Sequence, residues 1–169
     1  MLREQSKPAK LRAATAHVDR SITCGPWTIS FTRFFRTSPL RQAFTDHRDE
    51  TEEQIARLET VFEAIGKKPR GKTSEAMLGI IAEGQHVIDE VEDDAVRNGG
   101  ILAAGQTAEH YEIARYGTLR AWAELLGQDE VVELLSETLE EEKHADELLS
   151  SIAEGGINES ASERPQAAG

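Results

Sequence analysis

The sequence predicts an all-α helical bundle, and three features support this fold class. Only 5% of the residues are aromatic and five are proline, while Ala, Glu and Leu are abundant, a balance that favours helix. Apolar residues recur at helical spacing in four segments between residues 38 and 152. Glycine, proline and charged residues separate these segments. With 169 residues, the chain is about the length of one domain with a sizeable core.

Residues 1–38 do not follow this pattern. Cys24-Gly25-Pro26 interrupts any helix, and the β-branched and aromatic run at 27–31 has no second strand to pair with. We expect an atypical N-terminal segment, poorly ordered or foreign to the rest of the chain. A shifted reading frame or misassigned start would explain it, and so would genuine divergence.

The first regular helix is expected to begin at Ser38, a suitable N-cap followed by Pro39, and to end at Gly66. After a basic loop at 67–72, Thr73 or Ser74 can cap a second, shorter helix. The apolar line of the first helix is Leu40, Phe44, His47, Thr51, Ile55, Leu58, Phe62 and Ile65, and that of the second is Met77, Ile80, Gly84, Val87 and Val91.

A third helix is expected from Asp93 or Asp94 to Gly127, and a fourth from about Asp129. Their apolar lines are Ile101, Gly105, Ala108, Glu112, Tyr116, Leu119, Ala123 and Leu126, and then Val131, Leu135, Thr138, Glu142, Ala145, Leu149 and Ile152. Residues 155–169 are rich in Gly, Ser, Ala and Pro without periodicity, so we expect a disordered tail after a helical domain at 39–154.

Two glutamates lie on these apolar lines at matching positions. Glu112 and Glu142 are equally far from Gly127 along the sequence, one before it and one after it. In an antiparallel hairpin turning at 126–128, a rise of about 1.5 Å per residue places both carboxylates roughly 22 Å from the turn. An unpartnered buried carboxylate costs several kcal/mol, so this layer either binds a cation or destabilises the fold.

Further polar residues are expected near the same layer. Glu109 and Asp146 flank the two lines at nearly equal distances before and after Gly127, and His47 lies on the first helix with Glu50 at its edge. An oxygen-rich cluster with an imidazole suits iron or manganese. The candidate metal ligands are His47, Glu50, Glu109, Glu112, Glu142 and Asp146; no catalytic residue is assigned.

A structural role is the alternative for several of them. Glu109 or Asp146 alone is more often a solvated flank position, and His47 is equally well explained as a core histidine satisfied by Glu50. His110 and His144 lie off the apolar lines and are expected at the surface.

Charge and composition limit the remaining functions. The net charge is −12, with +6 on residues 1–48 and −18 on residues 49–169. We therefore expect no nucleic-acid partner, since phosphate binding needs clustered Lys and Arg. No segment approaches the roughly 18 apolar residues of a membrane span, so no membrane partner is expected. A single cysteine, Cys24, allows no internal disulfide and fits a cytoplasmic location.

Six short segments resemble the YciE/YciF family of ferritin-like stress proteins. They are HRDET at 47–51, RLE at 57–59, GKKP at 66–69, EHYEIA at 109–114, YGTLR at 116–120 and ETLEEE at 137–142. The resemblance covers about residues 40–154 and implies a ferritin-like four-helix bundle with a short extra helix, residues 74–91, in the long crossover. It also implies a bacterial, homodimeric, metal-binding protein, and supports Glu50, Glu109, Glu112, Glu142 and Asp146 as ligands.

The N-terminal segment departs from that family. Its members begin with an amphipathic helix whose acidic residues supply the remaining ligand. In residues 1–38 of this chain, the only acidic residues are Glu4 and Asp19. The first helix of the bundle is thus degraded or atypical. The leading hypothesis is a ferritin-like stress protein that binds iron or manganese. Its rivals are a metal-free dimeric scaffold, whose acids are satisfied by Arg115, Arg120 or protons, and a remnant lacking the first helix.

Overall fold

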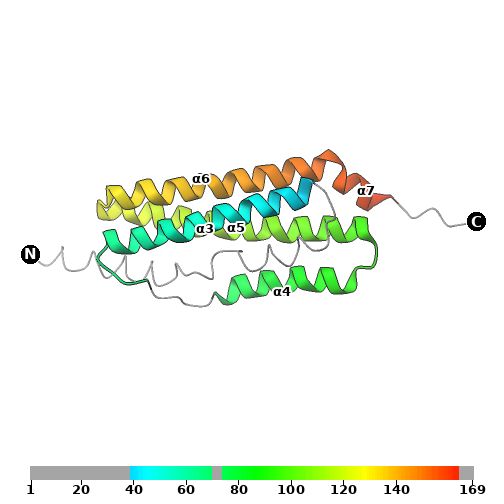
Figure 1. Cartoon of the computed structure of the whole chain (residues 1–169), viewed down its shortest axis with the longest axis horizontal. Helices are drawn as coiled ribbons and strands as arrows, with labels where there is room; N and C mark the ends of the chain where they lie inside the picture. The colour runs from blue at the N-terminus through cyan, green and yellow to red at the C-terminus, as the bar shows by residue number, and fades with distance from the viewer. Residues whose placement is uncertain (1–38, 70–73, 164–169) are drawn as a thin grey trace, which may run out of the picture.

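The computed structural model describes residues 39–69 and 74–163, and all regular structure in these ranges is helical. Four long helices run along a common axis (Figure 1): α3 (Pro39–Ala64), α4 (Glu75–Glu90), α5 (Asp94–Leu126) and α6 (Asp129–Ile152). The expected all-α bundle is confirmed, and α4 occupies the place of the short crossover helix. The expectations for residues 1–38, including a degraded first helix, fall outside the described residues.

The helix ends agree with the capping residues in the sequence. The Ser74 hydroxyl accepts the backbone N–H of Met77 at 3.2 Å, and the Asp93 carboxylate accepts two N–H groups at the start of α5. Gly127 ends α5 in the left-handed conformation, with φ of 67°. The expected hairpin between α5 and α6 therefore forms at this glycine.

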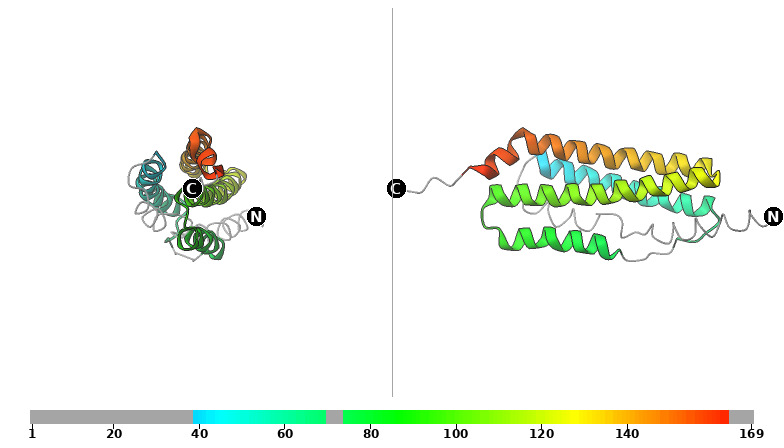
Figure 2. Two further views of the ribbon diagram at one scale, coloured as in Figure 1. Left: turned by 90° about the vertical axis from the view of Figure 1, so that its right-hand side faces the viewer. Right: turned by 180° about the vertical axis from the view of Figure 1, so that it is seen from behind.

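The helices pack in a defined order. Helix α5 packs against α6 on one side and against α4 on the other, and α3 packs against α6 (Figure 2). Two apolar clusters fill the interior: one includes Leu40, Phe44 and Ile101, and the other includes Leu58 and Tyr116. In each of α3, α5 and α6, one stretch belongs to the first cluster and another stretch belongs to the second. Buried polar residues lie between these two stretches. The core is thus two apolar regions separated by a polar layer.

A glycine allows close helix contact beside this layer. A Cβ atom on Gly105 would lie 2.9 Å from two ring atoms of Phe44 and 3.4 Å from a methyl group of Leu149. Only a residue without a side chain allows the Phe44 ring to pack directly on the backbone of α5.

The C-terminal end differs from the sequence-based expectation. Helical structure continues beyond residue 154 through a π-helical turn, η1 (Ala153–Ile157), and a short helix, α7 (Asn158–Ser162). Gly156 has φ of 130° and produces a kink there, and Ile157 packs on the first apolar cluster. The Gly-Gly pair at 155–156 interrupts the apolar periodicity, so the sequence pattern does not predict that the helix continues. Residues 164–169 of the expected tail lie outside the described residues.

None of the helices in the described ranges has the length and apolar character needed to cross a membrane.

Candidate metal centre

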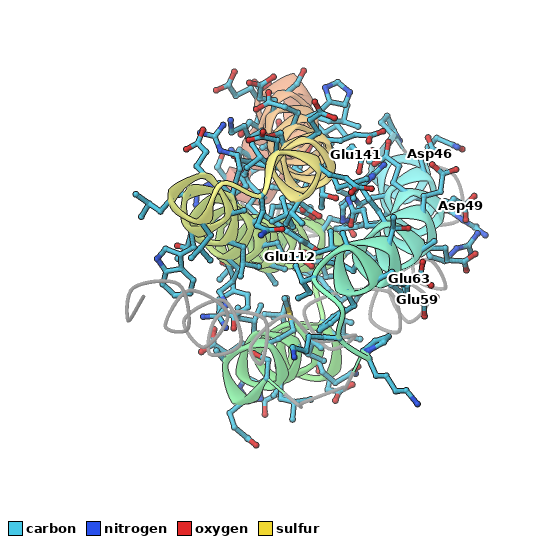
Figure 3. All side chains as sticks on the ribbon, turned by 90° about the vertical axis from the view of Figure 1, so that its left-hand side faces the viewer. Asp46, Asp49, Glu59, Glu63, Glu112 and Glu141 are labelled. Atoms are coloured by element: carbon cyan, nitrogen blue, oxygen red, sulfur yellow. The ribbon has the colours of Figure 1, made fainter. Side chains whose placement is uncertain are left out.

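Four potential metal ligands converge in the polar layer from three helices. They are His47 of α3, Glu109 and Glu112 of α5, and Glu142 of α6, and one ligand-type atom of each lies within 4.8 Å of the others. All four residues are at most 5% exposed. Figure 3, a view along the bundle, shows Glu112 in its interior, whereas Glu59 lies on the outer side of α3. We call these four residues the quartet.

The imidazole of His47 joins the acids of the other two helices. Its Nε2 atom lies 3.4 Å from Oε1 of Glu109 and 3.9 Å from Oε2 of Glu142. Its Nδ1 atom lies 3.6 Å from Oε2 of Glu50. The ring therefore has carboxylates near both nitrogens.

Helix geometry explains why these residues meet. Glu109 and Glu112 share one face of α5, where they are one turn from each other. The turn at Gly127 then brings Glu142 to the height of Glu112, as their equal spacing from that glycine predicts. Helix α3 packs against α6 and adds His47 to the layer.

The electrostatics of the quartet reflect its burial. Burial raises the pKa of Glu109 well above the ordinary value, and the neighbouring charges of Glu142 and Glu112 raise it further. Burial also raises the pKa of Glu142, although Glu109, with which it can share a proton, and His47 act in the opposite direction. Without a cation, the layer therefore favours protonation.

Glu50 has the reverse shift. The adjacent imidazole of His47 lowers the pKa of this carboxyl, with a smaller opposing effect of burial. Its side chain is 44% exposed, so Glu50 is an ionised group between the quartet and solvent.

The quartet fits a divalent cation. Oε2 of Glu109 and both carboxylate oxygens of Glu142 are buried and have no hydrogen-bond partner among the described residues. Such oxygens are costly to bury unless something compensates them. Three carboxylates and an imidazole form a donor set that suits iron or manganese, and the four together would hold one ion.

A second polar group supports the site from α3 and α6. Arg57 donates to both carboxylate oxygens of Glu141, at 2.7 and 2.8 Å, and to the hydroxyl of Thr138 at 2.8 Å. Gln54, fully buried, donates to Glu141 at 3.2 Å. This arrangement fixes the register of α3 on α6 next to Glu142.

This polar group was not predicted from the sequence. One signal was present: Glu137 and Glu141, one turn apart on α6, give Arg57 two acidic partners, and the Arg57–Glu137 separation is 3.2 Å. The partners lie on different helices far apart in the sequence, so spacing within one helix does not identify them.

The remaining predicted ligands lie outside the quartet. Glu50 contacts it through His47, and Asp146, 21% exposed, pairs with the surface residue His110 at 3.1 Å.

The expectation that Glu109 alone is a solvated flank position is wrong, since it is 2% exposed. His47 is a core histidine, as the structural alternative predicted, but it lies near two acids of the quartet as well as Glu50. Arg120, proposed as a partner of the buried acids, instead pairs with Glu124 at 3.7 Å.

Comparisons with known proteins agree with this architecture. A family model described as a domain of unknown function, DUF892, matches residues 31–162. Protein YciF of Escherichia coli K12 is 44% identical over 123 residues, which is 72% of this chain and 74% of YciF.

Two solved structures also match. The crystal structure of the E. coli stress protein YciF gives a TM-score of 0.81 at 35% identity, covering 94% of this chain and 99% of YciF. YcfI of Rhodopseudomonas palustris, named provisionally as a structural protein, gives 0.73 at 37% identity, covering 86% and 87%. The resemblance carried by the six sequence segments is therefore confirmed.

Proposed function

This chain belongs to the DUF892 family, and we propose that it is a ferritin-like metal-binding protein whose quartet holds an iron or manganese ion. The relative that it resembles is named as a stress protein, and we extend this role to the present chain. The proposed context is oxidative stress, in which a buried redox-active ion meets dioxygen or peroxide.

The convergence of the quartet carries the proposal. Four ligand-type atoms from three helices lie within 4.8 Å of one another in a layer that is almost fully buried. Removing ionised carboxylates from water costs several kcal/mol each, and their mutual repulsion adds to that cost. A divalent cation offsets both terms at once, because it supplies positive charge to oxygens that no described donor reaches.

The donor set favours particular metals. Structural zinc sites are usually built from cysteine and histidine, and no cysteine lies among the described residues. Calcium sites usually hold six to eight oxygen ligands. Carboxylates with an imidazole are common ligands of iron and manganese. When bound, such an ion would supply one-electron chemistry, and the chain itself would hold the ion and surround it with apolar residues on both sides.

The test is metal content and affinity in a charge-neutral variant. Purified full-length protein should bind Fe²⁺ or Mn²⁺ in stoichiometric amount, and the double variant E112Q/E142Q should lose that binding. The matched control is E124Q/E133Q, which removes one exposed acid from each of the same two helices. Equal binding by wild type and E112Q/E142Q would overturn the proposal.

A metal-free scaffold is the second candidate, and two observations favour it. Burial raises the pKa of Glu109 and of Glu142, which favours neutralisation of the layer by protons, and YcfI is named provisionally as a structural protein. In this case the chain would act as a homodimer. The large exposed apolar residues Trp122 and Leu125, 43% and 79% exposed at the end of α5, would form part of the interface.

Sedimentation equilibrium tests the second candidate separately from metal binding. A dimer that binds no metal, and that L125E converts to a monomer, would favour the scaffold. A protein that stays monomeric at high concentration would exclude it.

A further inference from the structure

A cavity lies beside the quartet, between α3 and α6. Its volume is about 130 Å³, and Phe44, Ala145 and Leu149 form apolar parts of its wall. The lining residues come from α3 and α6, with Glu109 as the one residue of α5. A cavity needs only about 10–15 Å³ to hold a water molecule, whereas pockets for organic ligands have about 300–1,000 Å³. It has room for a few water molecules or a partly hydrated ion.

Burial increases along the cavity. Asp46 and His144 are exposed, and Leu148 is 39% exposed. The side chain of Glu50 is 44% exposed, while His47 and Glu109 have side chains only 6% and 2% exposed. These residues line one cavity, which therefore extends from the surface to two members of the quartet.

Glu109 offers a free ligand atom at the buried end. Its Oε2 atom has no hydrogen-bond partner among the described residues, although the residue is only 2% exposed. Its Oε1 atom faces Nε2 of His47 at 3.4 Å. The unpartnered oxygen is thus available to a group that arrives through the cavity.

Given the proposed cation site, we infer that this cavity is the route by which a divalent cation enters and leaves the quartet, with Glu50 transferring it between solvent and the ligands His47 and Glu109. Asp46 and Glu50 place two carboxylates at the exposed part of the cavity. Acidic side chains raise the local concentration of cations in a cleft of low dielectric constant.

Glu50 is suited to this transfer by its position. It reaches solvent, and its carboxylate lies 3.6 Å from Nδ1 of the same imidazole whose Nε2 atom faces Glu109. A cation that replaces some of its bound water with a carboxylate oxygen of Glu50 is therefore next to His47, and His47 faces Glu109. Glu50 lies outside the quartet itself, which distinguishes a transfer role from that of a resident ligand.

The experiment measures rates of Mn²⁺ loading and release in the full-length protein. The electron paramagnetic resonance signal of free Mn²⁺ falls as the metal-free protein binds it, and an excess of chelator then measures release. We expect E50Q to slow both rates by about tenfold, because losing the transfer carboxylate raises the barrier equally for entry and exit, while the dissociation constant stays within about twofold. The control E53Q makes the same change one turn along α3 at an exposed position and should leave both rates unchanged.

A second variant tests the cavity without changing charge. L148W enlarges a partly exposed side chain in the wall and should also slow loading and release together. Wild-type rates in both E50Q and L148W would overturn the route. Faster release with at least about tenfold weaker binding in E50Q would make Glu50 a resident ligand and also overturn it. If wild-type protein binds neither Mn²⁺ nor Fe²⁺, the proposed function and the route both fail; if it binds and the rates do not change, only the route fails.

Discussion

Replacing Glu109 by glutamine should have opposite effects on the stability of the metal-free and the metal-loaded protein. In the metal-free protein, the Glu109 carboxyl is buried and unpartnered at Oε2, and its ionisation is opposed by burial and by the charges of Glu142 and Glu112. Glutamine keeps the shape and removes the charge. Replacing buried charged groups by neutral ones of similar volume stabilises proteins by about 1–4 kcal/mol in favourable cases. For a chain of this size, each kcal/mol shifts the melting temperature by about 2–4 °C.

The stability difference between E109Q and wild type should depend on pH. Because the pKa of Glu109 is raised in the folded state, this group contributes stability below its unfolded pKa, about 4.3, and that contribution is lost as pH rises through the folded pKa. The advantage of E109Q over wild type should therefore be small near about pH 4 and grow toward neutral pH. Glu142, whose pKa is also raised, acts in the same direction in both proteins.

Metal reverses the order of the two proteins. At a free cation concentration of about 1,000 times the dissociation constant, binding adds about 4.1 kcal/mol to the stability of wild type, which is more than the advantage of metal-free E109Q. E109Q lacks one of the four ligands and should gain much less. Urea denaturation with chelator or with Mn²⁺, at several pH values, measures both effects. A stability difference that is independent of pH in chelator, or a destabilised metal-free E109Q, would refute the reasoning.

Two further predictions concern the packing around the site. R57M should lower the free energy of unfolding by about 2–3 kcal/mol, because it leaves the Glu141 carboxylate, only 25% exposed, without its bidentate donor. Adding E141M should restore part of the loss, and a double-mutant cycle with no coupling would contradict this pairing. G105A should cost about 1–3 kcal/mol, since its methyl group would lie 2.9 Å from the Phe44 ring. The control G117A, with nothing within 4 Å, should stabilise α5 by about 0.5–1 kcal/mol; equal effects in thermal unfolding would contradict the packing argument.

The sequence contains enough information for the centre of the site. Glu112 and Glu142 lie on apolar lines at equal distances from Gly127, so one turn and a constant helical rise predict that they meet. Both are at most 1% exposed. The helix starts at Ser74 and Asp93 were also predictable, because capping depends on residues within one turn.

Interactions between distant helices were less accessible. Glu109 occupies a flank position on α5, and whether such a position is buried depends on which helix covers it; here His47 of α3 lies against it. The pairing of Arg57 with Glu141 depends on the register of α3 against α6, which no local pattern reports. The kink at Gly156 was missed because a glycine pair removes the apolar signal that sequence periodicity requires.

The placement of the quartet would couple the proposed cation binding to folding. Helix α3 reaches the layer through His47, while α5 and α6 reach it through their glutamates, so one ion would bind three helices from separate parts of the sequence. The apolar clusters on either side of the layer hold the helices together, but in the layer Oε2 of Glu109 and both carboxylate oxygens of Glu142 have no hydrogen-bond partner among the described residues. Metal affinity in such a site is paid for by weaker folding of the metal-free state, because ligands held in repulsive proximity relax on unfolding. In the proposed site, the same repulsion would strengthen the binding of a divalent ion, and the ion would compensate the buried carboxylates of the layer.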